Sequence, residues 1–126
     1  MKVVVVDDER IIRVALVDEL RDAGYHVKEF SNAQTALVEM KEFEPDVVVS
    51  DLKMPRMDGI EFLKKTKEYF PNTCFILMTA YSTVSTAVEA MKLGAYDYIT
   101  KPFDNEELLI VLKRVEEFRS VKEENK

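Results

Sequence analysis

Short apolar runs alternate along the whole chain with longer segments in which apolar residues recur every three or four positions. The runs predict five strands, within 3–6, 26–30, 47–49, 75–78 and 96–99. The spacing between them predicts five amphipathic helices, within 12–20, 33–40, 60–63, 84–91 and 108–115. Residues that break regular structure separate strand candidates from helix candidates and support this division: Gly24, Pro45, Gly59, Pro71, Gly94 and Pro102. The chain is therefore expected to form five successive β-α units.

Strict alternation of strands and helices predicts a parallel sheet with helices on both faces, because such strands are joined by right-handed crossovers. Runs 3–6, 47–49 and 75–78 are wholly apolar, as in strands buried on both faces. Runs 26–30 and 96–99 carry polar positions that suit the edges of a sheet. We therefore expect a doubly wound α/β domain, a flavodoxin-like (βα)5 fold with a five-stranded parallel sheet in the order 2-1-3-4-5.

One domain accounts for the length of the chain. It has 126 residues, 47% of them hydrophobic, and shows no internal repeat and no interior shift in composition. We expect the domain to cover residues 1–118. Beyond Phe118 a single apolar residue stands among mixed charges, so residues 119–126 are expected to be the end of a helix or the start of a linker.

Polar residues follow the predicted strands at their carboxyl ends, where open α/β sheets bind ligands next to the switch in strand order. Asp7 and Asp8 follow the first strand, Asp51 follows the third, and the last two strands lead to Thr79 and Lys101. Taken singly, each has a plain explanation as a helix cap, a turn residue, a loop hydroxyl or an exposed cation. Taken together, they are predicted to meet in one pocket.

Three carboxylates in one pocket need a positive partner. Two unit charges about 5 Å apart repel by roughly 3 kcal/mol at an effective dielectric near 20. A Mg²⁺ ion and Lys101 would together balance Asp7, Asp8 and Asp51. Mg²⁺ prefers a few carboxylates, retained waters and phosphate oxygens, so we expect a hard-cation site for Mg²⁺, with Mn²⁺ as a substitute. The alternative is a solvated groove in which the three acids tolerate one another without a metal.

Carboxylates, a divalent cation, a lysine and a hydroxyl are the parts of a phosphoryl-transfer site, where positioning and charge neutralisation provide most of the catalysis. Asp51 is the candidate nucleophile and would form an acyl phosphate. His26 is the only histidine and falls on a predicted edge strand, away from this pocket. A histidine base is therefore not expected.

Composition and charge narrow the partners. The net charge of −6 is the wrong sign for gathering nucleic-acid phosphates, so direct nucleic-acid binding by this domain is not expected. The apolar run at 3–6 is far shorter than the roughly 18 residues of a membrane helix, and too short for a signal peptide. We expect a cytoplasmic protein without membrane contact. Cys74 is the only cysteine and is expected to be a small buried hydrophobe.

Four motifs resemble the receiver domain of bacterial two-component response regulators. They are VVDDE at 5–9, DLKMPRMDG at 51–59, MTA at 78–80 and GAYDYITKPF at 94–103, in that order and at the predicted strand ends. The resemblance extends from Lys2 to about Phe118. The last motif and the run STAVEAMK at 85–92 most resemble receivers of AAA+ nitrogen-regulation-type transcription activators.

The resemblance implies a phosphorylation-dependent switch in two-component signal transduction and phosphorelay. Asp51 would accept a phosphoryl group from a phosphohistidine of a sensor histidine kinase, and the receiver would catalyse this transfer and its own dephosphorylation. Asp8, Asp51 and the backbone carbonyl of Lys53 would bind Mg²⁺ directly, and Asp7 would bind it through water. Thr79 and Lys101 would contact the phosphoryl oxygens.

The resemblance also implies an output surface. Thr79 would move toward the phosphoryl group and Tyr98 would turn inward, which would remodel the face made by the fourth helix, fifth strand and fifth helix. This face would contact a downstream output domain or protein, or a second copy in a homodimer. Lys53 and Tyr81 are expected to flank the mouth of the site and slow hydrolysis. The family pattern also implies a cis peptide bond at Lys101-Pro102.

Rival functions lack their own signatures. A flavodoxin-like electron carrier needs a hydroxyl-rich and amide-rich phosphate loop after the first strand, where this chain has acids. An aspartate-nucleophile phosphatase would carry Asp-x-Asp there, and a nucleotide hydrolase a Gly-rich loop ending in Lys-Ser or Lys-Thr. Neither pattern occurs. A phosphorylation-independent interaction domain of the same fold stays open as the alternative.

Overall fold

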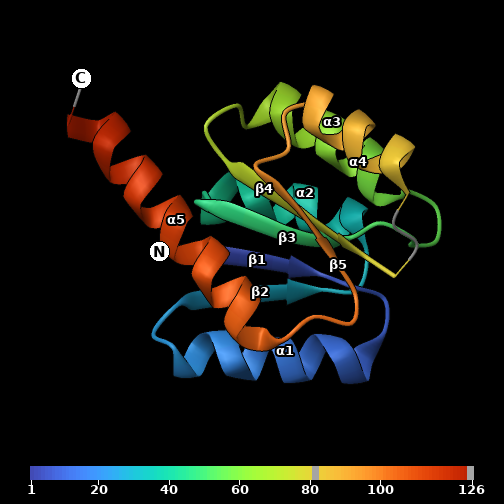
Figure 1. Cartoon of the computed structure of the whole chain (residues 1–126), viewed down its shortest axis with the longest axis horizontal. Coiled ribbons are helices and arrows are strands. Elements are labelled where there is room, and N and C mark those ends of the chain that lie inside the picture. The colour runs from blue at the N-terminus through green and yellow to red at the C-terminus, as the bar shows by residue number, and fades with distance from the viewer. Residues whose placement is uncertain (81–82, 125–126) are drawn as a thin grey trace.

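The computed structural model describes residues 1–80 and 83–124 and contains one parallel sheet in the order β2-β1-β3-β4-β5 (Figure 1). The strands are β1 Lys2–Val6, β2 His26–Phe30, β3 Val47–Asp51, β4 Cys74–Thr79 and β5 Asp97–Thr100. The helices are α1 Arg10–Asp22, α2 Ala33–Phe43, α3 Gly59–Tyr69, α4 Val84–Lys92 and α5 Asn105–Glu124. The predicted fold class and strand order are confirmed.

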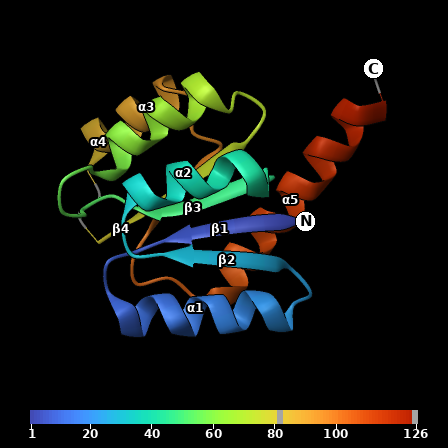
Figure 2. The same cartoon turned by 180° about the vertical axis from the view of Figure 1, so that it is seen from behind.

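Helices cover both faces of the sheet. Helices α1 and α5 lie on one face, and α2, α3 and α4 lie on the other (Figures 1 and 2). Alternate residues of β1 point to opposite faces. Val3 and Val5 join the core under α1 and α5, while Val4 and Val6 join the core under α2, α3 and α4. Both faces are buried, so the central strands consist of continuous apolar runs.

Side-chain caps fix the starts of three helices. Asn32 Oδ1 accepts a hydrogen bond from the N–H of Thr35 at the start of α2, and Asp58 Oδ1 accepts one from Glu61 at the start of α3. Thr83 caps α4 in the same way. Helix α1 begins after Glu9 without a side-chain cap. The plain alternative that Asp7 or Asp8 caps the first helix is therefore wrong, and both carboxylates belong to the adjoining loop.

The buried face of α4 differs from the one its apolar spacing indicates. Val84, Val88 and Met91 are 82%, 45% and 50% exposed, and Ala90 is the buried residue of this helix. A small side chain at Ala90 lets the helix backbone approach the sheet, which turns the larger apolar side chains outward. Apolar side chains gathered on an exposed helix face indicate an interaction surface.

Helix α5 is bound to the end of the sheet where the strands begin, opposite the carboxyl ends that carry the predicted site. Arg119 Nη2 lies 3.1 Å from Asp46 Oδ1, and Nη1 donates to the carbonyl oxygens of Asp46 and Asn72. Helix α5 continues to Glu124. His26 lies at this same end, at the start of β2 and against the ring of Phe43. Within the described residues no helix has both the length and the hydropathy needed to cross a membrane.

Candidate functional site

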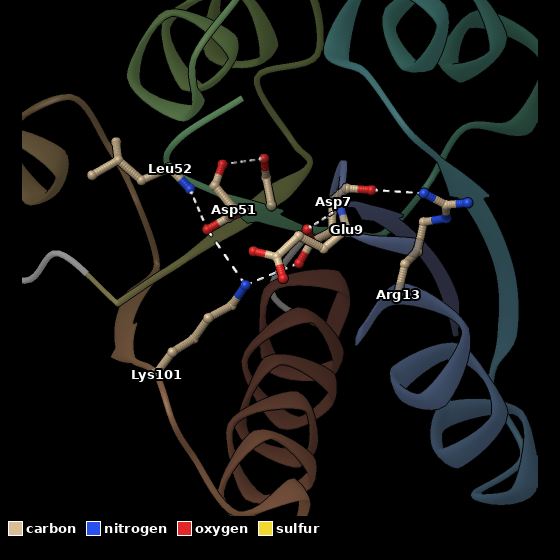
Figure 3. Close-up of polar contacts among 7 residues, drawn as sticks. Asp7, Glu9, Arg13, Asp51, Leu52 and Lys101 are labelled. Carbon is tan, nitrogen blue, oxygen red and sulfur yellow. Dashed lines mark hydrogen bonds and ion pairs between the residues drawn. The ribbon is translucent and has the colours of Figure 1, made fainter. Parts of the chain in front are cut away.

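Four strand ends carry the predicted site residues to one edge of the sheet. Asp7 follows β1, Asp51 is the last residue of β3, and Lys101 follows β5 (Figure 3). Thr79 is the last residue of β4. Asp7, Asp8 and Asp51 each offer a carboxylate oxygen, and these oxygens lie within 4.8 Å of one another. Asp7 is fully buried, Asp51 is 7% exposed and Asp8 is exposed.

Lys101 is the cation of this cluster. Its Nζ donates to Asp7 Oδ2 at 2.9 Å and lies 3.5 Å from Asp51 Oδ1 (Figure 3). Burial alone would lower the pKa of Lys101, but the hydrogen bond and ion pair with Asp7, together with the charge of Asp51, outweigh burial and raise that pKa. The ammonium group therefore stays charged at neutral pH. The Lys101-Pro102 peptide bond is cis, as predicted.

The pKa of the Asp51 carboxyl group is raised toward neutral pH. Burial raises its pKa most strongly, Lys101 lowers it, and the charge of Asp7 raises it again. The N–H of Leu52, which donates to Asp51 Oδ1 at 3.0 Å, also favours the carboxylate. The net result is a pKa raised from 3.8 to about 6. At neutral pH the group is mostly a carboxylate anion, which a neighbouring cation stabilises.

Replacing Asp51 by asparagine is expected to stabilise the metal-free protein at pH 7.5. A shift from 3.8 to about 6 corresponds to at most about 3 kcal/mol, and with partial solvation we expect a gain of about 1 to 2 kcal/mol. A carboxyl whose pKa is raised by folding opposes folding most above the folded pKa and least below the unfolded pKa. The gain should therefore shrink as the pH falls from about 6 toward 4.

Urea unfolding in EDTA at pH 7.5 and pH 4.5 checks this expectation, with Asp18→Asn on α1 as the control. A gain of the same size at both pH values, or a loss of stability at pH 7.5, would contradict it.

The other predicted residues lie as follows. Thr79 is buried and pairs with Thr100 in the sheet, and its carbonyl accepts a hydrogen bond from the N–H of Lys101. Lys53 is exposed in the loop after β3. Tyr98 lies half-buried on the edge strand β5, with its hydroxyl buried. Tyr81 lies outside the described residues.

Sequence reasoning missed the residues that support the acids from behind. Arg13 of α1 donates to the carbonyl oxygen of Asp7 (Figure 3). It also donates to the carboxylate of Glu29 on β2. A basic residue on an amphipathic helix usually lies on the solvent face, so its position alone gave no signal. Gly59 was predicted only as a break and as the end of a motif, although the backbone of Asp51 and Leu52 leaves no room for a Cβ there.

The donor set of this site suits a hard divalent cation. The described ligands are carboxylate oxygens, without a cluster of imidazole or thiolate groups, and oxygen ligands favour Mg²⁺ and Mn²⁺. The exposed Asp8 lies beside two buried acids, so one side of the cluster is open to water and to a phosphate. The described residues thus include an Asp cluster that could hold Mg²⁺, as the resemblance to receiver domains implies.

Known proteins resemble this chain over nearly its full length. Residues 3–113 match the family described as response regulator receiver domain. The regulatory protein AtoC of Escherichia coli (strain K12) is 42% identical over 123 residues, which cover 98% of this chain and 27% of AtoC. The chain thus spans about a quarter of the length of this relative.

Solved structures agree with this assignment. The beryllofluoride-activated NtrC4 receiver domain dimer superposes with a TM-score of 0.86 at 38% identity, covering 90% of this chain and 94% of that one. NtrX from Brucella abortus superposes with a TM-score of 0.90 at 32% identity, covering 98% of this chain and 28% of that one. By family match, sequence identity and fold alike, the chain belongs to the response regulator receiver domains of two-component systems.

Proposed function

We propose that Asp51 is the phosphoacceptor of a phosphorylation-dependent switch, supplied by the phosphohistidine of a sensor histidine kinase. The observation that carries this proposal is the position of Asp51, a largely buried carboxylate 3.5 Å from Lys101 and beside two further acids. A carboxylate oxygen of Asp51 forms the new P–O bond. The P–N bond of the donor breaks, and its electron pair returns to an imidazole that is protonated on its other nitrogen and leaves as neutral histidine.

Asp8, Asp51 and the backbone carbonyl of Lys53 would hold Mg²⁺ directly, and Asp7 would hold it through a water. When bound, the ion neutralises charge on the phosphoryl oxygens and on the acids around them. Lys101 is close enough to Asp51 to pair with one oxygen of a phosphoryl group bound there. The Thr79 hydroxyl is proposed to donate a hydrogen bond to another phosphoryl oxygen. Water that enters past Lys53 would later hydrolyse the acyl phosphate, so the domain would also catalyse its own dephosphorylation.

Labelling by phosphoramidate, a small donor with a P–N bond, tests this proposal. The wild-type protein should gain a phosphoryl group in Mg²⁺ and lose this ability in EDTA. Asp8→Asn should fold normally and be labelled at least about 100-fold more slowly, because it lacks the exposed metal ligand. Asp18→Asn on α1 is the matched control and should behave like the wild type. Equal labelling of Asp8→Asn and Asp18→Asn would overturn the metal role.

We further propose that output passes through the α4-β5-α5 face. The edge strand β5 lies between α4 on one face of the sheet and α5 on the other (Figure 1). This face exposes Val88 and Met91 of α4 and Ile110 of α5. Apolar side chains in water favour a partner, either a downstream output domain or a second copy of the chain. The NtrC4 receiver, 38% identical to this chain, is described as a dimer when activated, which supports the second copy.

Met91→Glu tests the output face separately from the phosphoacceptor site. The variant should be labelled by phosphoramidate as fast as the wild type, because residue 91 lies on an exposed helix face. It should lose association of the phosphorylated domain, measured by sedimentation velocity, with Val38→Glu on exposed α2 as the control. Association that survives in Met91→Glu would move the interface elsewhere.

Tyr98 is proposed as the switch residue together with Thr79. Its hydroxyl is buried and has no hydrogen-bond partner within the described part of the chain. An unpaired buried hydroxyl costs about 1 to 3 kcal/mol. The inward position of the Tyr98 hydroxyl is therefore unfavourable until a hydrogen-bond partner is supplied. We propose that movement of Thr79 toward the phosphoryl group alters the space around the ring and stabilises the inward position.

Tyr98→Phe is expected to stabilise the unphosphorylated domain by about 1 kcal/mol, because it removes the hydroxyl and keeps the ring. Thermal unfolding of the wild type, Tyr98→Phe and the control Tyr69→Phe, whose ring is exposed, measures the effect. A loss of stability confined to Tyr98→Phe would show that the hydroxyl already has a partner.

A further inference from the structure

Arg13 connects the site loop, which follows β1 and comprises Asp7, Asp8 and Glu9, to the edge strand β2. Its Nη1 donates to the backbone oxygen of Asp7 at 2.9 Å (Figure 3). Its Nε donates to Glu29 Oε1 at 3.0 Å. The guanidinium is largely buried, and Glu29 lies on β2 beside β1. One side chain of α1 thus connects the end of β1 with its neighbouring strand.

The oxygen that Arg13 binds belongs to the peptide group that leads from Asp7 into Asp8. The N–H of Asp7 donates to the carbonyl of Phe30, so the main chain of Asp7 is held on both sides. The Asp7 side chain is held as well, because Oδ1 accepts from the N–H of Glu9 and Oδ2 accepts from Lys101. Because these hydrogen bonds fix the plane of the Asp7-Asp8 peptide group, they also limit the orientation of the Asp8 backbone.

Asp8 needs such support because it is the exposed member of the acidic cluster. An exposed carboxylate next to two other anions is repelled by them, and solvent offers it other rotamers. Glu29 has a complementary part. Glu29 balances the charge of Arg13. It also directs the guanidinium to the carbonyl oxygen of Asp7 and away from the carboxylates that would bind a divalent cation.

We propose that Arg13, oriented by Glu29, is a positioning residue for the divalent-cation site: it fixes the Asp7-Asp8 peptide so that Asp8 presents its carboxylate beside Asp7 and Asp51. This inference rests on the proposed function, because it concerns the same cation site. Groups that orient metal ligands typically change metal affinity 10-fold to 100-fold when they are removed.

The sign of the effect separates positioning from simple electrostatics. Removing a positive charge near a cation site should strengthen cation binding by Coulomb's law. Loss of positioning should weaken it. Arg13→Ala is therefore expected to bind Mn²⁺ and Mg²⁺ 10-fold to 100-fold more weakly than the wild type. Arg13→Lys keeps the charge but lacks the planar fork that reaches two partners, so its affinity should fall between the two.

The experiment titrates each protein with Mn²⁺, followed by electron paramagnetic resonance of the free ion, and then displaces Mn²⁺ with Mg²⁺. Arg10→Ala is the matched control, since it removes the same charge from an exposed position at the start of the same helix. It should bind within about twofold of the wild type. Urea unfolding in EDTA shows which variants are folded, and Arg13→Lys carries the test if Arg13→Ala does not fold.

Binding by Arg13→Ala or folded Arg13→Lys that is as tight as the wild type, or tighter, would overturn the inference. The readout is cation affinity, so it is independent of phosphorylation. If the wild type binds Mn²⁺ but is never labelled at Asp51, the phosphoacceptor proposal fails while weakened binding in Arg13→Ala still supports the positioning role. If labelling succeeds and Arg13→Ala binds normally, the positioning role alone fails.

Discussion

Replacing Lys101 by methionine is expected to lower the free energy of unfolding by about 2 to 4 kcal/mol in the absence of divalent cations. Methionine keeps much of the aliphatic volume of lysine, so the change mainly removes the charge. Asp7 would then be a fully buried carboxylate without its 2.9 Å partner, and Asp51 would lose its cation at 3.5 Å. Uncompensated buried charge is among the most destabilising changes a domain can undergo.

Urea unfolding in EDTA measures this loss, and Lys113→Met on the exposed side of α5 is the control, expected to change stability by less than about 0.5 kcal/mol. Saturating Mg²⁺ should restore part of the stability of Lys101→Met, because a bound cation replaces some of the missing positive charge. Stability equal to that of the wild type in EDTA would show that Lys101 does not neutralise the acids.

Gly59→Ala is expected to cost about 2 to 3 kcal/mol and to abolish divalent-cation binding. A Cβ at this position would lie 2.5 Å from the carbonyl oxygen of Asp51 and 2.8 Å from the Cα of Leu52. Both are backbone atoms and cannot move aside without moving the end of β3. The substitution would therefore displace Asp51 as well as strain the start of α3, where the N–H of Gly59 donates to Leu52 at 2.7 Å.

Gly94→Ala is the matched control for this variant. Gly94 has a φ of +100°, so alanine is strained there by about 1 to 2 kcal/mol, but its nearest neighbour would be the flexible side chain of Lys67 at 3.4 Å. It precedes β5, at the opposite edge of the sheet from the acids. Unfolding and Mn²⁺ titration of both variants should show lost stability in each and lost binding only in Gly59→Ala. Intact binding in Gly59→Ala would contradict the close packing seen here.

The fold followed from the sequence because its signals are local and agree with one another. Strands such as β1 are buried on both faces and are therefore continuous apolar runs, and the polar positions of β2 and β5 marked them as edges. The parallel arrangement then brings Asp7, Asp51 and Lys101 to one edge without further information. The acidic cluster could thus be predicted from the order of strand ends alone.

Other features depend on distances that a sequence does not contain. The outward face of α4 is decided by how closely Ala90 approaches the sheet, and apolar spacing gives no sign of it. Arg13 contacts Asp7 because α1 returns beside β2, which places a helix residue behind the site loop. The pKa of Asp51 reflects burial against the opposing charge of Lys101, and neither quantity can be predicted without coordinates.

The phosphoacceptor role of Asp51 is best tested by the intact mass of the wild type and of Asp51→Asn, measured side by side after incubation with Mg²⁺ and acetyl phosphate. We expect a gain of about 80 Da, one phosphoryl group, that requires both Mg²⁺ and Asp51. A wild-type protein that binds Mg²⁺ but gains no mass, or an Asp51→Asn protein that gains the same mass, would contradict it. The first of these results would favour a phosphorylation-independent interaction domain of the same fold.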